Sequence, residues 1–203
     1  MTISPSAGLI AILRGVTPAD VLDIATAIFD AGFNAVEVPL NSPEPFESIR
    51  RLRVELGPDR RIGAGTVLTP QDVRRAAEAG SSLIVSPNTR PDVVAETVRL
   101  GLESYPGVAT PTEAFAALDA GARAMKLFPS STIGIDGMKA WISVLPVGTE
   151  LIPVGGVDAD NLGDWARAGA AGAGIGSSLY RPGDSVADVV PRAVAMVRAW
   201  ESA

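Results

Sequence analysis

The chain has 203 residues, of which 47% are hydrophobic and 20% are charged, and its formal net charge is -6. This length favours one well-buried domain over residues 1–203, and the acidic balance disfavours nucleic acid or an anionic membrane surface as a partner. The sequence contains no cysteine and no histidine. That excludes disulfides, thiolate nucleophiles, Cys or His metal sites, and triads that use imidazole. Proton transfer must come from Glu, Asp, Lys, Tyr or water.

Two further features concern location. The apolar runs are much shorter than the roughly 18 residues of a membrane span. The opening "MTISPSAGLI" has no basic segment followed by a long apolar stretch, so no signal peptide is expected. We therefore expect a cytoplasmic protein.

Short apolar runs alternate with amphipathic stretches along the chain. Residues 18–32 (PADVLDIATAIFDAG) place apolar side chains at three- and four-residue spacing, which is typical of a helix packed on a core. A last helix is expected over about 185–202. Continuous apolar strands between helices indicate a parallel sheet covered on both faces. The eight expected strands are 9–13, 34–38, 61–66, 82–86, 103–107, 123–128, 151–156 and 172–176.

Helix boundaries carry their own signals. A Ser or Thr that precedes proline can cap a helix whose first residue is that proline, and a glycine after the last turn suits a left-handed C-terminal cap. The expected N-terminal pairs are Thr17-Pro18, Ser42-Pro43, Thr69-Pro70 and Thr110-Pro111. The expected closing glycines are Gly32, Gly57, Gly80, Gly101, Gly121 and Gly169.

Eight strand–helix units predict an α/β fold of the (β/α)8 TIM-barrel type, somewhat smaller than the usual size of about 250 residues. A doubly wound open sheet is the alternative, and the strand count makes it less favourable. In a barrel, chemistry gathers at the C-terminal strand ends. Those ends carry Arg14, Glu37, Thr66, Pro87, Pro106-Gly107, Lys126, Gly155-Gly156 and Gly176-Ser177.

Lys126 is one of only two lysines and lies inside the apolar run 123–128. Because side chains alternate along a strand, Lys126 faces the barrel axis if Met125 and Leu127 face the helices. Desolvation there disfavours the charged amine and makes it a usable nucleophile. The alternative is a lysine that extends to the barrel mouth or pairs with a carboxylate.

Glu37 should also point inward, between Val36 and Val38, and in a chain without histidine it is the natural acid–base group. Arg14 ends the first strand and can bind a substrate carboxylate through two parallel hydrogen bonds. A structural ion pair between Arg14 and Glu37 is an equal alternative.

The glycine-rich ends of the seventh and eighth strands indicate an anion site. Gly155, Gly156 and Gly176 expose backbone N–H groups, and Ser177 and Ser178 add hydroxyls. Barrels often bind phosphate with these two loops, although strand-end glycines also serve ordinary turns. Lys139 and the scattered arginines are interpreted as solvated surface without a role.

The segments "IAILRG", "AVEVPLNSP", "IGAGTVL", "MKLFPSS", "PVGGV" and "GAGIGSSLYR" resemble, in order and over nearly the whole chain, the class I 2-keto-3-deoxy-6-phospho-aldonate aldolases. The resemblance implies a barrel, a homotrimer, and a reaction without metal or cofactor on a small phosphorylated keto acid. It places the Schiff-base lysine at Lys126 and the acid–base glutamate at Glu37. It also implies pyruvyl binding by Arg14 and Thr66, and phosphate binding by Gly155, Gly156, Gly176 and Ser177.

Within that family, the 2-dehydro-3-deoxy-6-phosphogalactonate branch is the nearest match. The gluconate branch carries an arginine where this chain has Asn41, and it reads "FPAE" and "PTGG" where this chain reads "FPSS" and "PVGG". The resemblance therefore implies cleavage of the galactonate substrate into pyruvate and D-glyceraldehyde 3-phosphate. Cleavage of the gluconate epimer, or of both, is the alternative. A non-covalent phosphosugar isomerase or synthase, and a silent phosphosugar-binding barrel, are less favoured readings.

Overall fold

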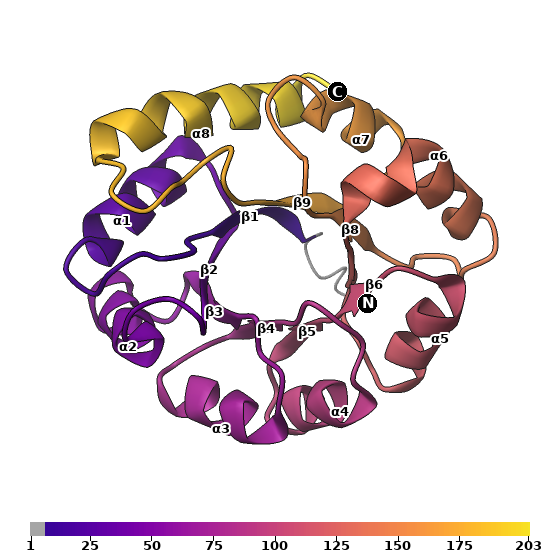
Figure 1. Ribbon diagram of the computed structural model, residues 1–203, viewed down its shortest axis with the longest axis horizontal. Coiled ribbons are helices and arrows are strands. Elements are labelled where there is room, and N and C mark those ends of the chain that lie inside the picture. Colours follow the sequence, from indigo (N-terminus) through magenta and orange to yellow (C-terminus); the bar gives the residue numbers. More distant parts are fainter. Residues whose placement is uncertain (1–6) are drawn as a thin grey trace.

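The computed structural model describes residues 7–203, in which short parallel strands form a central ring that helices surround (Figure 1). The strands are β1 (Gly8–Ile12), β2 (Ala35–Pro39), β3 (Arg61–Gly65), β4 (Leu83–Val85), β5 (Glu103–Tyr105), β6 (Gly107–Val108), β7 (Met125–Leu127), β8 (Leu151–Pro153) and β9 (Gly172–Ile175). The helices are α1 (Val21–Ala31), α2 (Pro45–Leu56), α3 (Pro70–Glu78), α4 (Pro91–Arg99), α5 (Pro111–Asp119), α6 (Ser130–Ile142), α7 (Leu162–Arg167) and α8 (Val186–Glu201).

The strands close into a barrel. Six of them pair in the order β5-β4-β3-β2-β1-β9, and three pair in the order β6-β7-β8. A parallel bridge between Val154 and Gly174 joins β8 to β9. On the other side, the backbone N–H groups of Arg123 and Lys126 donate to the carbonyls of Ser104 and Pro106. The (β/α)8 prediction is confirmed, and the open-sheet alternative is wrong.

The fifth strand differs from its prediction. Residues 103–107 were expected to form one strand, but the structure divides this region into β5 and β6, on either side of Pro106. Proline lacks a backbone N–H and cannot donate to a strand neighbour. Pro106 still accepts a hydrogen bond from Lys126 N at 2.9 Å, so the neighbouring strand keeps its place.

The expected N-terminal caps hold for two of the four helices. The hydroxyls of Thr69 and Thr110 accept hydrogen bonds from the third residue of α3 and α5, and a proline follows each. The prediction is wrong for Ser42, and Thr17 does not cap α1, although its hydroxyl accepts a hydrogen bond from Asp20 N at 3.4 Å in the turn before that helix. Helix α1 begins only at Val21, and α2 begins at Pro45 after Glu44, neither with a side-chain cap. Ser42 instead accepts a hydrogen bond from Gly15 N in the neighbouring loop.

The closing glycines follow a common rule. At each of five glycines φ is positive, and the next residue donates a backbone hydrogen bond to the carbonyl five positions earlier. These are Gly32, Gly80, Gly101, Gly121 and Gly169. Gly57 departs from the prediction, because its ψ of -179° lies outside the left-handed helical region.

Two apolar layers position the site. Outward-facing strand residues such as Leu9, Ala11 and Val36 pack with the helices in one cluster. Inward-facing residues such as Ile10 and Ile152 form a second cluster inside the barrel. This alternation is the period of two of a β-strand.

Polar side chains close the N-terminal end of the barrel. Arg61 donates to Glu103 Oε2 at 2.7 Å and to the carbonyl of Ala7 at 2.9 Å, and Tyr105 donates its hydroxyl to Glu103. The Tyr105 hydroxyl is therefore bound at the base of the barrel and does not serve the opposite end. No helix within residues 7–203 is long and apolar enough to cross a bilayer. The segment to which the signal-peptide expectation applies lies mostly outside the described residues.

Candidate active site

Lys126 lies on β7, in register with Gly107 on β6 and Ile152 on β8. Its neighbours Met125 and Leu127 pack outward against the helices, so the lysine side chain enters the barrel, as alternation predicts. Lys126 is only 7% exposed. Burial lowers the pKa of its amine; the charge of Glu37 opposes this shift and the charge of Arg14 adds to it.

Glu37 lies on β2, between Ile12 of β1 and Gly63 of β3. Glu37 is 1% exposed, and its Oε2 atom has no hydrogen-bond partner within the described residues. Burial raises the pKa of Glu37 to about 7, although the charges of Lys126 and Arg14 oppose the rise. A buried carboxyl with that pKa can accept or donate a proton near neutral pH.

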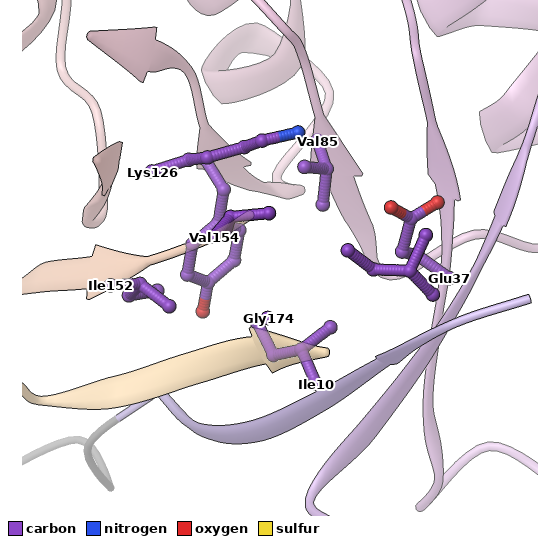
Figure 2. A pocket seen from close by; sticks show the side chains of 9 residues that line it. Ile10, Glu37, Val85, Lys126, Ile152, Val154 and Gly174 are labelled. Atoms are coloured by element: carbon purple, nitrogen blue, oxygen red, sulfur yellow. The ribbon is translucent and has the colours of Figure 1, made fainter. Parts of the chain in front are cut away.

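Lys126 and Glu37 reach into the barrel from facing walls (Figure 2). In this view the amine and the carboxylate both lie toward one end of a small apolar space, and Ile10, Ile152 and Gly174 lie toward the other. The charge of each group shifts the pKa of the other, but the two groups form no salt bridge. The alternative of a lysine held in a carboxylate pair is therefore not observed in the described part of the chain.

An aromatic ring accompanies the amine. Lys126 Nζ lies 4.6 Å from the centroid of the Phe128 ring. The face of an aromatic ring attracts cations, so Phe128 favours positive charge on this nitrogen without supplying a proton acceptor.

Above Lys126 the barrel opens into a pocket of about 780 Å³, within the range of small-molecule sites. The pocket is lined by seven of the eight residues predicted for the site: Arg14, Thr66, Lys126, Gly155, Gly156, Gly176 and Ser177. Glu37, the eighth, lines the space below, which Lys126 also borders. The structure therefore brings the predicted residues together at one end of the barrel.

Thr66 has an unusual backbone. Its φ is 55°, a left-handed conformation that a β-branched residue rarely adopts. The conformation follows directly after β3 and places Thr66 in the wall of the pocket. Strain of this kind is commonly found at functional sites.

Arg14 is held by the next loop rather than by Glu37. Its Nη1 donates to Asn41 Oδ1 at 2.6 Å, and the following Gly15 N donates to Ser42 Oγ at 2.9 Å. The alternative of an Arg14–Glu37 ion pair is not observed in the described residues. The guanidinium is exposed at the pocket and keeps donors for a ligand.

The loop after β8 turns its carbonyls away from the pocket. The Gly155 carbonyl accepts from Ser130 Oγ at 2.7 Å and from Ser131 N at 3.1 Å. The Gly156 carbonyl accepts from Asn161 Nδ2 at 2.8 Å. Because the C=O and N–H of a trans peptide point in opposite directions, the N–H groups of Gly156 and Val157 point away from these acceptor contacts. Both glycines have positive φ, 94° and 81°, which glycine adopts without a steric cost.

Sequence reasoning missed several lining residues, and Arg181 is the basic one among them. Arg181 borders the same pocket and donates from Nε to the Ser177 carbonyl at 3.1 Å, although the scattered arginines were given no role. Its place four residues after Ser177, in "GSSLYR", was the available signal. Ser130 and Ser131, in contrast, line a neighbouring surface hollow and not this pocket.

Chemically, the arrangement offers a desolvated amine, an acid–base carboxyl on the facing wall of the same space, a guanidinium above, and a glycine-rich turn for an anion. Within residues 7–203, no three or more Asp or Glu side chains gather where they could hold a metal ion. A reaction without metal or cofactor stays a prediction.

Comparisons with known proteins agree with this chemistry. A family model described as "Aldolase: KDPG and KHG aldolase" matches residues 2–189. The chain is 49% identical over 195 residues to 2-dehydro-3-deoxy-6-phosphogalactonate aldolase of Escherichia coli K12, covering 96% of this chain and 95% of that protein.

Two solved structures are similarly close. One, described as "Native KDPGal structure", superposes with a TM-score of 0.96 at 48% identity and covers 100% of this chain and 98% of its own. The other is a cube-shaped, highly porous protein cage designed by fusing symmetric oligomeric domains. It has a TM-score of 0.94 at 49% identity and covers 96% of this chain and 72% of its own.

Proposed function

The chain belongs to the KDPG and KHG aldolase family, and we propose that it is a class I aldolase that cleaves 2-dehydro-3-deoxy-6-phospho-D-galactonate into pyruvate and D-glyceraldehyde 3-phosphate. The observation that carries the proposal is the buried Lys126 amine, whose pKa is lowered, in one site with Glu37. The 49% identity to a protein named for this substrate supports the choice of substrate.

The neutral Lys126 amine attacks the C2 ketone and forms a carbinolamine, which loses water to give a protonated imine. This cation accepts the electron pair of the C3–C4 bond as that bond breaks. Glu37 removes the C4 hydroxyl proton, and glyceraldehyde 3-phosphate leaves. The enamine that remains is protonated at C3, and water then hydrolyses the pyruvate imine and frees the amine.

Other residues orient the substrate. Arg14 and Thr66 hold the pyruvyl end, Arg14 through the carboxylate. The N–H groups and hydroxyl of Gly155, Gly156, Gly176 and Ser177 hold the phosphate. Binding energy at the phosphate fixes the position of the C3–C4 bond relative to Lys126 and Glu37.

Borohydride trapping tests the covalent step. With pyruvate and borohydride, a peptide map should show one adduct, on Lys126, and Lys126→Met should form none and release no pyruvate while it keeps its fold. Turnover without any adduct would overturn the Schiff-base mechanism and favour a non-covalent isomerase or synthase. Tight ligand binding without turnover would favour a silent phosphosugar-binding barrel.

The gluconate epimer is the second candidate substrate, since the two acids differ only at C4. Val154 and Asn41 lie where the two family branches differ; Val154 lines the pocket, and Asn41 contacts Arg14. Pyruvate release from both epimers, compared as kcat/KM, separates the candidates. A preference for the galactonate acid is expected, and equal or reversed values would reject the assignment to that branch but not the chemistry.

We also propose that residues 1–203 form one aldolase domain that acts in galactonate degradation in the cytoplasm and assembles as a homotrimer. The similar cage built from symmetric oligomeric domains supports an assembly. Ile142, Val144 and Val147, exposed apolar side chains at and after the end of α6, offer surface for one. Light scattering should give three times the mass of the chain, and a monomeric mass would reject the trimer.

A further inference from the structure

Arg181 lies in the connection between β9 and α8, at the rim of the large pocket. Its side chain is exposed, and its Nε donates to the carbonyl of Ser177 at 3.1 Å. Ser177 belongs to the glycine-rich turn that the proposed function assigns to phosphate. The guanidinium is therefore tied to one wall of the proposed phosphate site.

The Arg181 guanidinium has no acidic partner within residues 7–203. The nearby carboxylate of Asp184 accepts the backbone N–H of Arg181 at 2.9 Å, but it forms its ion pair with Arg192. Hydrogen bonding to Arg192 lowers the pKa of Asp184, so this carboxylate already has a cation of its own. The side-chain charge of Arg181 is left for a ligand.

Three basic side chains line the pocket: Arg14, Lys126 and Arg181. Under the proposed function, Lys126 forms the imine and Arg14 binds the carboxylate. The acidic side chain that lines the same pocket, Asp158, accepts backbone N–H groups of the turn before α7. Arg181 is thus the one cation of the pocket lining that remains for a phosphate of nearly two negative charges.

We propose that Arg181 binds the phosphate of the substrate, as the charged member of a site whose other members are backbone N–H groups and the Ser177 hydroxyl. This inference rests on the proposed function. A guanidinium donates two parallel hydrogen bonds to phosphate oxygens, and Arg181 keeps its terminal nitrogens available for them. Its bond to the Ser177 carbonyl sets the side chain against the turn before the ligand arrives.

The test compares a reaction that involves the phosphate with one that does not. Pyruvate carries no phosphate, so the rate of borohydride trapping on Lys126 with pyruvate reports on the amine and carboxylate sites alone. Cleavage of the 6-phosphorylated keto acid also requires the phosphate site. Arg181→Gln should lower kcat/KM for cleavage by roughly 10- to 100-fold, mainly through KM, and leave pyruvate trapping unchanged.

Two variants sharpen the comparison. Arg181→Lys keeps the charge and should recover part of the loss, since only the paired hydrogen bonds are missing. Arg198→Gln removes the same charge from an exposed arginine on α8 and should behave as the wild type. Inhibition of the wild type by inorganic phosphate should weaken in Arg181→Gln by a similar factor.

Two results would overturn the proposal: unchanged cleavage in Arg181→Gln, or an equal loss in cleavage and in pyruvate trapping. The second would indicate a structural role. If the wild type neither cleaves the phosphorylated acid nor traps pyruvate, the proposed function fails, which is distinct from a failure confined to Arg181→Gln.

Discussion

A β-carbon on residue 65 would lie 1.6 Å from Oε2 of Glu37, so the carboxylate occupies space that exists because residue 65 is glycine. Gly65 ends β3, which pairs with β2 through the whole of that strand. The φ of Gly65 is not in the positive region. The requirement for glycine is therefore one of space next to the carboxylate and not of backbone conformation.

Gly65→Ala should displace Glu37 and lower kcat by about 100-fold or more, within the usual contribution of a positioned acid–base group. The measurement is kcat for pyruvate release in a double-mutant cycle with Glu37→Gln. If the alanine acts through Glu37, the double variant should be no slower than Glu37→Gln alone. Additive losses would show that Gly65→Ala damages the site by another route, and an unfolding curve checks that the fold survives.

The sequence predicts the barrel and the inward direction of Lys126 and Glu37 because both follow from a strand period of two. A lysine or glutamate between two apolar residues on a parallel strand has only the barrel interior to enter. The same reasoning cannot predict which loops touch one another. Ser42 was expected to cap a helix but hydrogen-bonds the next loop, because α2 begins only at Pro45.

Arg181 is a second residue whose loop contact the sequence does not predict. Along the chain it resembles other exposed arginines, and only the folded connection between β9 and α8 brings it beside Ser177. The left-handed backbone of Thr66 likewise has no signal in the residue type, since β-branched residues rarely adopt it. Short-range patterns therefore identify the elements and the inward side chains, while loop geometry needs the tertiary structure.

The activity should depend on pH through Glu37 and Lys126. Under the proposed function, cleavage requires an ionised Glu37, whose pKa is about 7, and attack requires a neutral Lys126, whose pKa is lowered by burial. Both requirements favour higher pH, so kcat/KM should rise as pH passes through about 7. The charge of Arg14 lowers the pKa of both groups. Arg14→Gln should therefore move the rising limb to higher pH.

The measurement is the profile of kcat/KM against pH for the wild type and each variant. The quantity to compare is the pH at which kcat/KM rises, not the maximum that it reaches. Under the proposed function the height of the profile also falls, because Arg14→Gln removes the contact to the substrate carboxylate. Arg198→Gln makes the same change in net charge on α8 and should leave the limb in place. A limb that stays fixed in Arg14→Gln would mean that Arg14 does not act on these two groups.

Protein stability should show the burial of Glu37 independently of activity. Its pKa is about 7 in the fold against a usual 4.5, so between these values the folded state binds more protons than the unfolded state. The contribution of Glu37 to the free energy of unfolding is therefore greatest below about pH 4.5. It decreases as the pH rises from there to about 7. Glutamine does not ionise, so Glu37→Gln lacks this decrease. Between pH 5 and pH 8 its free energy of unfolding should rise by about 2 to 3 kcal/mol relative to that of the wild type.

Urea unfolding of both proteins at several pH values measures that difference. Glu78→Gln, on the exposed face of α3, is the control for the change in net charge. A difference between wild type and Glu37→Gln that does not grow with pH would contradict the raised pKa.

Arg14 donates a hydrogen bond to Asn41, and Gly15 N donates one to Ser42, so we expect Asn41 to position the guanidinium. Asn41→Ala should raise the pyruvate concentration that half-saturates borohydride trapping by about tenfold, because Arg14 loses its orientation before it meets the carboxylate. Asn41→Asp should raise this concentration further, since a carboxylate at this position would pair with Arg14 and compete with the substrate.

The control is the same pair of changes in an Arg14→Gln background, where neither should weaken pyruvate trapping any further. A changed ratio between the two C4 epimers with unaltered pyruvate trapping would instead mean that Asn41 reads the C4 hydroxyl and does not orient Arg14.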